Sequence, residues 1–410
     1  MDGCPPLPDL READLTGAVR RALGSESAVP MNWQVHPLGG GRGEITGGVY
    51  RVAGGGHDQG HRVSWSLVLK VVPEPDEGDD PGAHNYWKRE FHIYQAGLLA
   101  DLPGITAPRC WGADDRPGEG TWLWLEDISG LRRAAWRDQD DAQAARNLGQ
   151  FGAAYLRDRP LPRGAWLSDR MLRKESAFFG PYLRGLPATL DHPLVRQFCP
   201  AGQAARLERL WTAREALLRK VEGLPRTFCH LDAIRRNLYR REGTDEPTVV
   251  LDWEWAGIGA LGEDLAPLVA GSLCMGDAAA ADGRRLDAVA FTGYIDGLLG
   301  AGWRGDPAEV RLAYAAASAL RYGLWGAWLA GQLAREEDGH ATVSAFFARP
   351  VGAVVQQFTP LLPQLLDYAD EAQAAIDLGG ADTGDGDLFE DVRGSDGAVG
   401  VAGSAGLELR

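Results

Sequence analysis

The side chains best suited to chemistry are an aspartate and an asparagine on one short segment and a second aspartate after an apolar run. Asp232 and Asn237 lie within residues 228–239, and Asp252 ends the run 248–251. A carboxylate can accept the proton of a hydroxyl group, and carboxylate and amide oxygens are ligands that Mg²⁺ prefers. The set is therefore typical of phosphoryl transfer, in which positioning and charge neutralisation do most of the work.

The spacing of these residues is more informative than their types. A single Asp or Asn in a loop is usually a turn or cap residue. The pattern His-x-Asp-x-x-x-x-Asn, followed by a turn and a strand that ends in Asp, is much more restrictive. Residues 242–246 are typical of a turn between two short strands. A hairpin there would return Asp252 to the segment that carries Asp232 and Asn237.

A lysine inside a predicted strand is a further candidate. Lys70 lies in the apolar stretch 65–72, where an unpaired charge is costly. The stretch 86–99 has apolar residues at helical spacing and carries Glu90, the expected partner of Lys70. Acidic residues in the intervening loop 73–82 compete for this pairing. The alternative is that Lys70 lies at a strand edge and that its amine reaches water.

The motif resembles that of the aminoglycoside phosphotransferase and choline kinase-like family, the small-molecule relatives of protein kinases. The usual family form has Gly where this chain has Leu231, a position at which protein kinases also carry a side chain. The resemblance implies that His230 orients the loop and that Asp232 is the catalytic base. It also implies that Asn237 and Asp252 bind Mg²⁺.

The resemblance covers roughly residues 33–370 and implies an α+β, bilobal protein kinase-like fold. It implies ATP and Mg²⁺ as cofactors, with Lys70 and its partner Glu90 at the α- and β-phosphates. It further implies a connector between the lobes, at Glu126 and Ile128, whose backbone groups bind adenine.

Three further features of the sequence are weaker candidates for a functional site. The glycine-rich stretch 39–43 could cover phosphates, although it matches no standard nucleotide-binding loop. Asp264 is expected to be a structural cap rather than a ligand. His57 and His61 are four residues apart, but they lie in a glycine-rich stretch with no third ligand, so we do not predict a metal site there.

The surrounding patterns predict the elements that must position these residues. We expect a short helix that ends at Gly24, strands at 48–52 and 65–72 with a break at residues 54–56, and a buried central strand at 121–125. From residue 138 to about 370 the pattern is mainly helical. The apolar stretch 313–334 predicts a buried helix. The aromatic residues Trp303, Tyr322, Trp325 and Trp328 are expected to pack in the core.

These elements predict three parts. Residues 1–126 would form an N-terminal nucleotide-binding lobe, and residues 127–376 a C-terminal catalytic and acceptor-binding lobe. Residues 377–410 are rich in Asp and Gly and lack periodicity, so we expect an acidic, disordered tail.

Composition excludes several classes of protein. The chain carries 57 acidic and 42 basic residues, for a net charge of −15, which disfavours a nucleic-acid partner. No run is long and apolar enough to span a membrane, and the N-terminal segment is unlike a signal peptide. Five scattered cysteines favour neither a disulfide framework nor a zinc site. We therefore expect a cytoplasmic protein without nucleic-acid or membrane partners.

The predicted function is ATP- and Mg²⁺-dependent transfer of the γ-phosphoryl group to a hydroxyl of a small molecule. An aminoglycoside, a sugar, an amino alcohol and a natural-product hydroxyl are equally admissible acceptors, and no oligomeric state is predicted. One alternative is a catalytically silent, nucleotide-binding regulator on the same fold. The other is a protein kinase, which the lack of an Ala-Pro-Glu segment after Asp252 disfavours.

Overall fold

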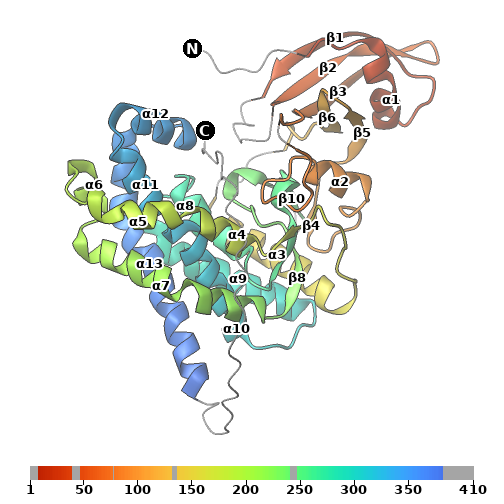
Figure 1. Ribbon diagram of the computed structural model, residues 1–410. Helices are drawn as coiled ribbons and strands as arrows, with labels where there is room; N and C mark the ends of the chain where they lie inside the picture. The colour runs from red at the N-terminus through yellow and green to blue at the C-terminus, as the bar shows by residue number, and fades with distance from the viewer. Residues whose placement is uncertain (1–7, 39–46, 77, 132–135, 241–246, 382–410) are drawn as a thin grey trace, which may run out of the picture.

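The chain folds into a small β-rich N-terminal lobe and a larger helical C-terminal lobe, as predicted (Figure 1). This α+β architecture is seen in a computed structural model. The structure describes residues 8–38, 47–76, 78–131, 136–240 and 247–381.

The N-terminal lobe is built on a five-stranded antiparallel sheet with the strand order β1-β2-β3-β6-β5. Its strands are β1 (Val29–Pro37), β2 (Gly48–Asp58), β3 (His61–Val72), β5 (Cys110–Arg116) and β6 (Gly120–Glu126). Two helices, α1 (Glu12–Leu23) and α2 (Arg89–Gln95), accompany this sheet.

Strand β6 is buried on both faces, as its continuous apolar run predicts. Trp122 and Trp124 pack in the same cluster as the apolar residues of α1. Leu123 and Leu125 point to the opposite face and pack with Phe91 of α2. Because successive side chains of a strand alternate between faces, one short strand joins two layers of core.

The predicted break at residues 54–56 is wrong, and strand β1 was not predicted. Strand β2 continues through the three glycines and turns into β3 at Gln59 and Gly60, which both have positive φ. A Cβ atom on Gly54 or Gly56 would clash with the backbone of β1. These glycines therefore allow β1 to approach, whereas in the sequence they resemble a loop.

The two N-terminal helices differ in how well their ends were predicted. Helix α1 ends at the expected position, where Gly24 adopts a left-handed conformation with φ of 64°. Helix α2 is shorter than the predicted stretch 86–99, because residues 96–100 form turns.

The C-terminal lobe is mainly helical, as predicted. Its α-helices are α3 (Asp138–Arg157), α4 (Met171–Phe178), α5 (Gly180–Thr189), α6 (Pro193–Phe198), α7 (Ala201–Glu222), α8 (Ser272–Cys274), α9 (Gly283–Gly300), α10 (Pro307–Ala317), α11 (Trp325–Leu333), α12 (Glu336–Phe347) and α13 (Val351–Ala381). Two π-helical segments, η3 (Pro267–Gly271) and η5 (Ser318–Gly323), and three 3₁₀ turns, η1 (Arg235–Asn237), η2 (Trp253–Trp255) and η4 (Ala280–Asp282), lie between them.

The stretch predicted as one buried helix, 313–334, is buried but not continuous. It spans the end of α10, the π-helical segment η5 and helix α11. Its aromatic residues Tyr322 and Trp328 belong to the main core, as expected, and Trp325 packs against that core. The wider π-helical turn re-aims the side chains of η5 relative to those of α10.

Two small sheets carry the segments of chemical interest. One has the order β4-β10-β9 and the other the order β7-β11-β8. Their strands are β4 (Ile105–Thr106), β7 (Ser168–Asp169), β8 (Arg226–Cys229), β9 (Leu238–Tyr239), β10 (Thr248–Val250) and β11 (Gly257–Ala260). Strands β9 and β10 pair antiparallel, as the predicted hairpin requires, while the turn residues 242–246 lie outside the described residues.

Some residues before the predicted lobe boundary at residue 126 pack with the C-terminal lobe. Strand β4 precedes that position but pairs with β10 of the C-terminal lobe. Ile93 and Ile105 belong to the core of the same lobe. At the other end, helix α13 continues past the predicted start of the tail at residue 377, and residues 382–410 lie outside the described part of the chain.

Two findings bear on the classes excluded above. Within the described ranges, no helix has both the length and the apolar character needed to cross a lipid bilayer. Of the cysteines in those ranges, Cys110, Cys199, Cys229 and Cys274 are all free.

We predict that Gly54→Ala destabilises the N-terminal lobe, because its Cβ atom would meet the carbonyl oxygen of Asn32 on β1. The free energy of unfolding should fall by about 1–3 kcal/mol, as for other overpacked sites. Chemical denaturation measures this loss. Gly55→Ala is the matched control: its Cβ atom meets only the flexible Asn32 side chain and the Val63 carbonyl at 3.1 and 3.7 Å. Equal losses in the two variants would contradict the close-approach argument.

Candidate active site

Three carboxylates surround the ammonium group of Lys70, one from α2 and two from the segment that follows β10. Its Nζ lies 2.6 Å from Glu90 Oε2, 2.6 Å from Asp252 Oδ1 and 3.7 Å from Glu254 Oε2. The Lys70 and Glu90 side chains are 7% and 4% exposed, whereas Asp252 is 37% exposed. Burial alone would lower the pKa of Lys70, but the three carboxylates raise it well above its usual value. The predicted pairing of Lys70 with Glu90 is thus present.

Helix α2 is fixed to the segment that carries Asp252. The second oxygen of Glu90 accepts a hydrogen bond from the Trp253 backbone N–H at 3.1 Å. The neighbouring Arg89 is buried, and its guanidinium donates to the backbone carbonyl groups of Glu254 and Trp166. Two consecutive residues of α2 therefore connect the lobes directly beside the Lys70 cluster.

His230 links the loop of residues 230–237, hereafter the Asp232 loop, to the strand before Asp252. Its Nδ1 accepts a hydrogen bond from the Asp232 backbone N–H at 3.1 Å. Its Nε2 therefore carries the proton and donates to the Leu251 carbonyl at 2.9 Å. Burial lowers the pKa of His230 to about 4, so the ring is neutral. This geometry agrees with the predicted orienting role.

Asn237 and Asp232 are hydrogen-bonded to each other across the Asp232 loop. The Asn237 Nδ2 group donates to the Asp232 backbone carbonyl at 2.9 Å and to its Oδ2 at 3.1 Å. Burial, together with the nearby carboxylates of Asp252 and Glu175, raises the pKa of Asp232 to about 7. The structure thus brings Asp232 and Asn237 together and places Asp232 close enough to Asp252 for electrostatic coupling.

Asp264 holds the backbone at the start of the Asp232 loop. Its two carboxylate oxygens accept the backbone N–H groups of His230 at 3.1 Å and Leu231 at 2.7 Å. The carboxylate is buried, which raises its pKa to about 6, while the two N–H groups favour its charged form. The structural role expected for Asp264 is therefore present, as a brace for the loop rather than as a helix cap.

The remaining predicted residues lie where the chain leaves the N-terminal sheet. Glu126 ends β6, and its Oε2 accepts the Arg109 backbone N–H at 3.2 Å. Ile128 lies two residues after β6, and its carbonyl oxygen accepts the Leu131 backbone N–H at 2.8 Å in a turn. The glycine-rich stretch 39–43 lies outside the described residues. The contact of Glu126 and Ile128 with a nucleotide stays a prediction.

Arg89, Arg321 and Glu175 belong to this neighbourhood but were not identified from the sequence. Arg89 fixes α2 to the C-terminal lobe, and Arg321 lies 3.0 Å from Glu175 Oε2 and 3.4 Å from Asp232 Oδ1. Arg321 carried a usable signal, since it is a charge inside the apolar stretch 313–334. The same signal identified Lys70, but no nearby acidic residue suggested a partner for Arg321.

The donor atoms of the site suit a magnesium ion better than a zinc ion. Within the described residues, no group of three or more His, Cys, Asp or Glu side chains is arranged to hold a metal. A carboxylate from Asp252 and an amide oxygen from Asn237 are the hard ligands that Mg²⁺ accepts when phosphate and water complete its shell. The residues present therefore fit a metal that arrives with a phosphorylated ligand.

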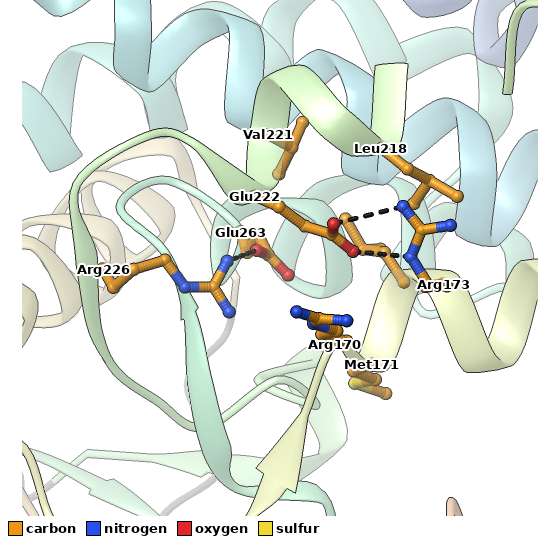
Figure 2. Close-up of a pocket in the computed structure, with 9 residues that line it drawn as sticks. Arg170, Met171, Arg173, Leu218, Val221, Glu222, Arg226 and Glu263 are labelled. Carbon is orange, nitrogen blue, oxygen red and sulfur yellow. Dashed lines mark hydrogen bonds and ion pairs between the residues drawn. The ribbon is translucent and has the colours of Figure 1, made fainter. Parts of the chain in front are cut away.

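A small cavity next to the Asp232 loop is not a substrate site. It is lined by Arg170, Met171, Glu222, Arg226, Glu263 and their neighbours, and Figure 2 shows their charged groups turned toward one another. Its volume of about 10 Å³ is about that needed by one water molecule.

The model of the phosphotransferase enzyme family matches residues 50–304, which include every predicted site residue. No curated protein gives a significant sequence match.

Among solved structures, an aminoglycoside phosphotransferase from Alicyclobacillus acidocaldarius is similar, with 18% identity, coverage of 87% of this chain and 99% of that chain, and a TM-score of 0.49. A choline kinase from Cryptosporidium parvum has 16% identity, coverage of 85% and 91%, and a TM-score of 0.46. A choline/ethanolamine kinase family protein from Mesorhizobium loti has 18% identity, coverage of 82% and 92%, and a TM-score of 0.41.

We predict that Asp264→Asn lowers the free energy of unfolding by about 1–3 kcal/mol, because its amide oxygen can replace only one acceptor and leaves a buried N–H unpaired. Urea denaturation measures the change. Asp191→Asn is the matched control, since Asp191 is fully exposed in its ion pair with Arg196 and such pairs contribute little. An Asp264 variant as stable as this control would contradict the bracing role.

Proposed function

Because the chain belongs to the phosphotransferase enzyme family, we propose that it transfers the γ-phosphoryl group of ATP, with Mg²⁺, to a hydroxyl group of a small molecule. The observation that carries the proposal is the junction around Lys70, where Glu90 and Asp252 both lie 2.6 Å from its ammonium group. The hydrogen-bonded pair Asp232 and Asn237 adjoins this junction.

On the nucleotide side, Lys70 would bind the α- and β-phosphates while Glu90 holds the ammonium group in place. Asp252 and Asn237 would hold Mg²⁺, which neutralises the charge that develops on the transferred group. Asp252 is the most exposed of the three carboxylates around Lys70, at 37% against 4% for Glu90 and 12% for Glu254. Asp252 is therefore the carboxylate best able to give up its contact with Lys70 and bind a metal ion instead.

On the acceptor side, Asp232 would accept the proton of the attacking hydroxyl group. The hydroxyl oxygen forms a bond to the γ-phosphorus as the bond to the bridging oxygen breaks, and ADP leaves. Asn237 Nδ2 and Arg321 Nη2 hold the carboxylate of Asp232 from two sides, at 3.1 and 3.4 Å. Alignment of the reacting groups is the main contribution that this chain would make.

The proposed acceptor is a small alcohol of the aminoglycoside, sugar or amino alcohol class. A purified-protein screen for ADP release over these compounds tests the proposal. Activity toward generic protein substrates alone would instead favour a protein kinase. Binding of MgATP without ADP release from any compound would favour the silent regulator.

We predict that Asp252→Ala weakens the binding of MgATP at least about tenfold, because the metal loses its one carboxylate ligand. Titration of the thermal midpoint with MgATP, and with ATP plus a chelator, measures the effect and its metal dependence. Asp158→Ala, at an exposed position after α3, is the control. Unchanged metal-dependent binding in the Asp252 variant would exclude Asp252 as a ligand.

We predict that Asp232→Asn retains the binding of MgATP within about threefold but lowers the rate of ADP release by about 10²–10⁴-fold, the usual contribution of a general base. Steady-state turnover with the best acceptor from the screen, together with the same thermal titration, separates the two effects. Full turnover in this variant would remove Asp232 from the role of catalytic base.

A further inference from the structure

The backbone of Leu231 adopts a left-handed conformation with φ of 63°. Such a conformation is unfavourable for any residue with a Cβ atom and is the usual place for glycine. Leu231 directly precedes Asp232, so a relaxation of this backbone would turn the Asp232 carboxylate. A residue that holds the left-handed conformation therefore acts on Asp232.

The peptide groups on both sides of Leu231 are held by charged side chains. Its N–H donates to Asp264 Oδ1 at 2.7 Å. Its carbonyl oxygen accepts a hydrogen bond from Nη1 of Arg321. The Leu231 side chain is itself buried with Met171 and Cys229. The loop conformation is thus maintained by a brace on each side and by apolar packing.

Arg321 reaches this position from a distant helix. It lies in the π-helical segment η5, and its side chain is 9% exposed. Its guanidinium group contacts Glu175 of α4 at 3.0 Å through Nε, the Leu231 carbonyl through Nη1 and Asp232 Oδ1 at 3.4 Å through Nη2. A planar guanidinium can bind three groups in fixed directions at once, which a lysine ammonium cannot reproduce.

We propose that Arg321 is a positioning residue for the phosphoryl transfer described above, on which this inference rests: it holds the left-handed Leu231 peptide and the Asp232 carboxylate in their reactive arrangement. The brace is required because Leu231 stands where a glycine would adopt this backbone without cost. Glu175 fixes the far end of the guanidinium group. Arg321 therefore acts through Leu231 and Asp232.

The first test is Arg321→Lys, which keeps the positive charge beside Glu175 but loses the second and third contacts. The probe reaction is ADP release from MgATP with water as the acceptor, so that no identified substrate is needed. We expect kcat to fall at least tenfold while the KM for MgATP stays within twofold. Arg173→Lys is the matched control, because Arg173 pairs with Glu215 and Glu222 outside the site. A raised KM with an unchanged kcat would overturn the proposal and assign Arg321 to nucleotide binding.

The second test is rescue by glycine. In the Arg321→Lys background, Leu231→Gly should restore kcat at least threefold, because glycine adopts the left-handed conformation without support. Leu231→Ala removes the same packing but keeps the Cβ atom, so it should restore nothing. Equal effects of the two substitutions would overturn the proposal, as would rescue by alanine alone.

A further pair of measurements covers unstable or inactive protein. If Arg321→Lys misfolds, the double variant Arg321→Gln with Glu175→Gln replaces it, because it removes both charges of the ion pair together. Its kcat and its KM for MgATP are then compared with those of the unsubstituted chain. If the unsubstituted chain neither binds MgATP nor releases ADP, the proposed function fails. The role of Arg321 is then tested by thermal denaturation. We expect Leu231→Gly to have a higher thermal midpoint than Leu231→Ala, and this difference should become smaller when Arg321 is also replaced. An unchanged difference would overturn the proposal.

Discussion

The buried ammonium group of Lys70 is the constraint on which the arrangement of the two lobes depends. A charge that is 7% exposed is costly unless opposite charges lie close to it. Glu90 comes from α2, whereas Asp252 and Glu254 come from the segment after β10, so neutralising one lysine brings together the sheet of one lobe and the hairpin of the other. Removal of either Glu90 or Asp252 would leave this buried ammonium group with only one carboxylate at 2.6 Å.

The Asp232 loop meets a different constraint, which is the geometry of its backbone. Leu231 has a positive φ, so the loop cannot rely on local conformational preference. It relies instead on contacts from residues distant in sequence, in which Asp264 accepts two backbone N–H groups and Arg321 donates to a carbonyl group. The segment is thus shaped by tertiary contacts, which explains why it tolerates a side chain at the usual position of a glycine.

The sequence predicted those features whose signal is local. Asp232 and Asn237 have a fixed spacing within one loop, and a charge inside an apolar strand identified Lys70. The features that were missed depend on contacts between distant segments: Arg321 and Glu175 are 146 positions apart. The glycines of β2 were read as a break because their need for space is set by the neighbouring strand β1, which has few buried residues to reveal it. Spacing therefore indicated which side chains come together, but not which other side chains hold them in place.

Charge balance links the two constraints. Carboxylates outnumber the cations that hold them: Glu90, Asp252 and Glu254 lie around Lys70, and Asp232 and Glu175 around Arg321. A triphosphate that bound beside Lys70 without a metal would place negative charge next to the carboxylates of Glu90 and Asp252, and in a partly buried site such repulsion is weakly screened. A divalent cation bound between Asp252 and the phosphates would reverse the sign of that interaction. The acidity of the site therefore supports the proposal that a nucleotide enters together with its metal, in which case the ammonium of Lys70 would exchange a carboxylate contact for a phosphate.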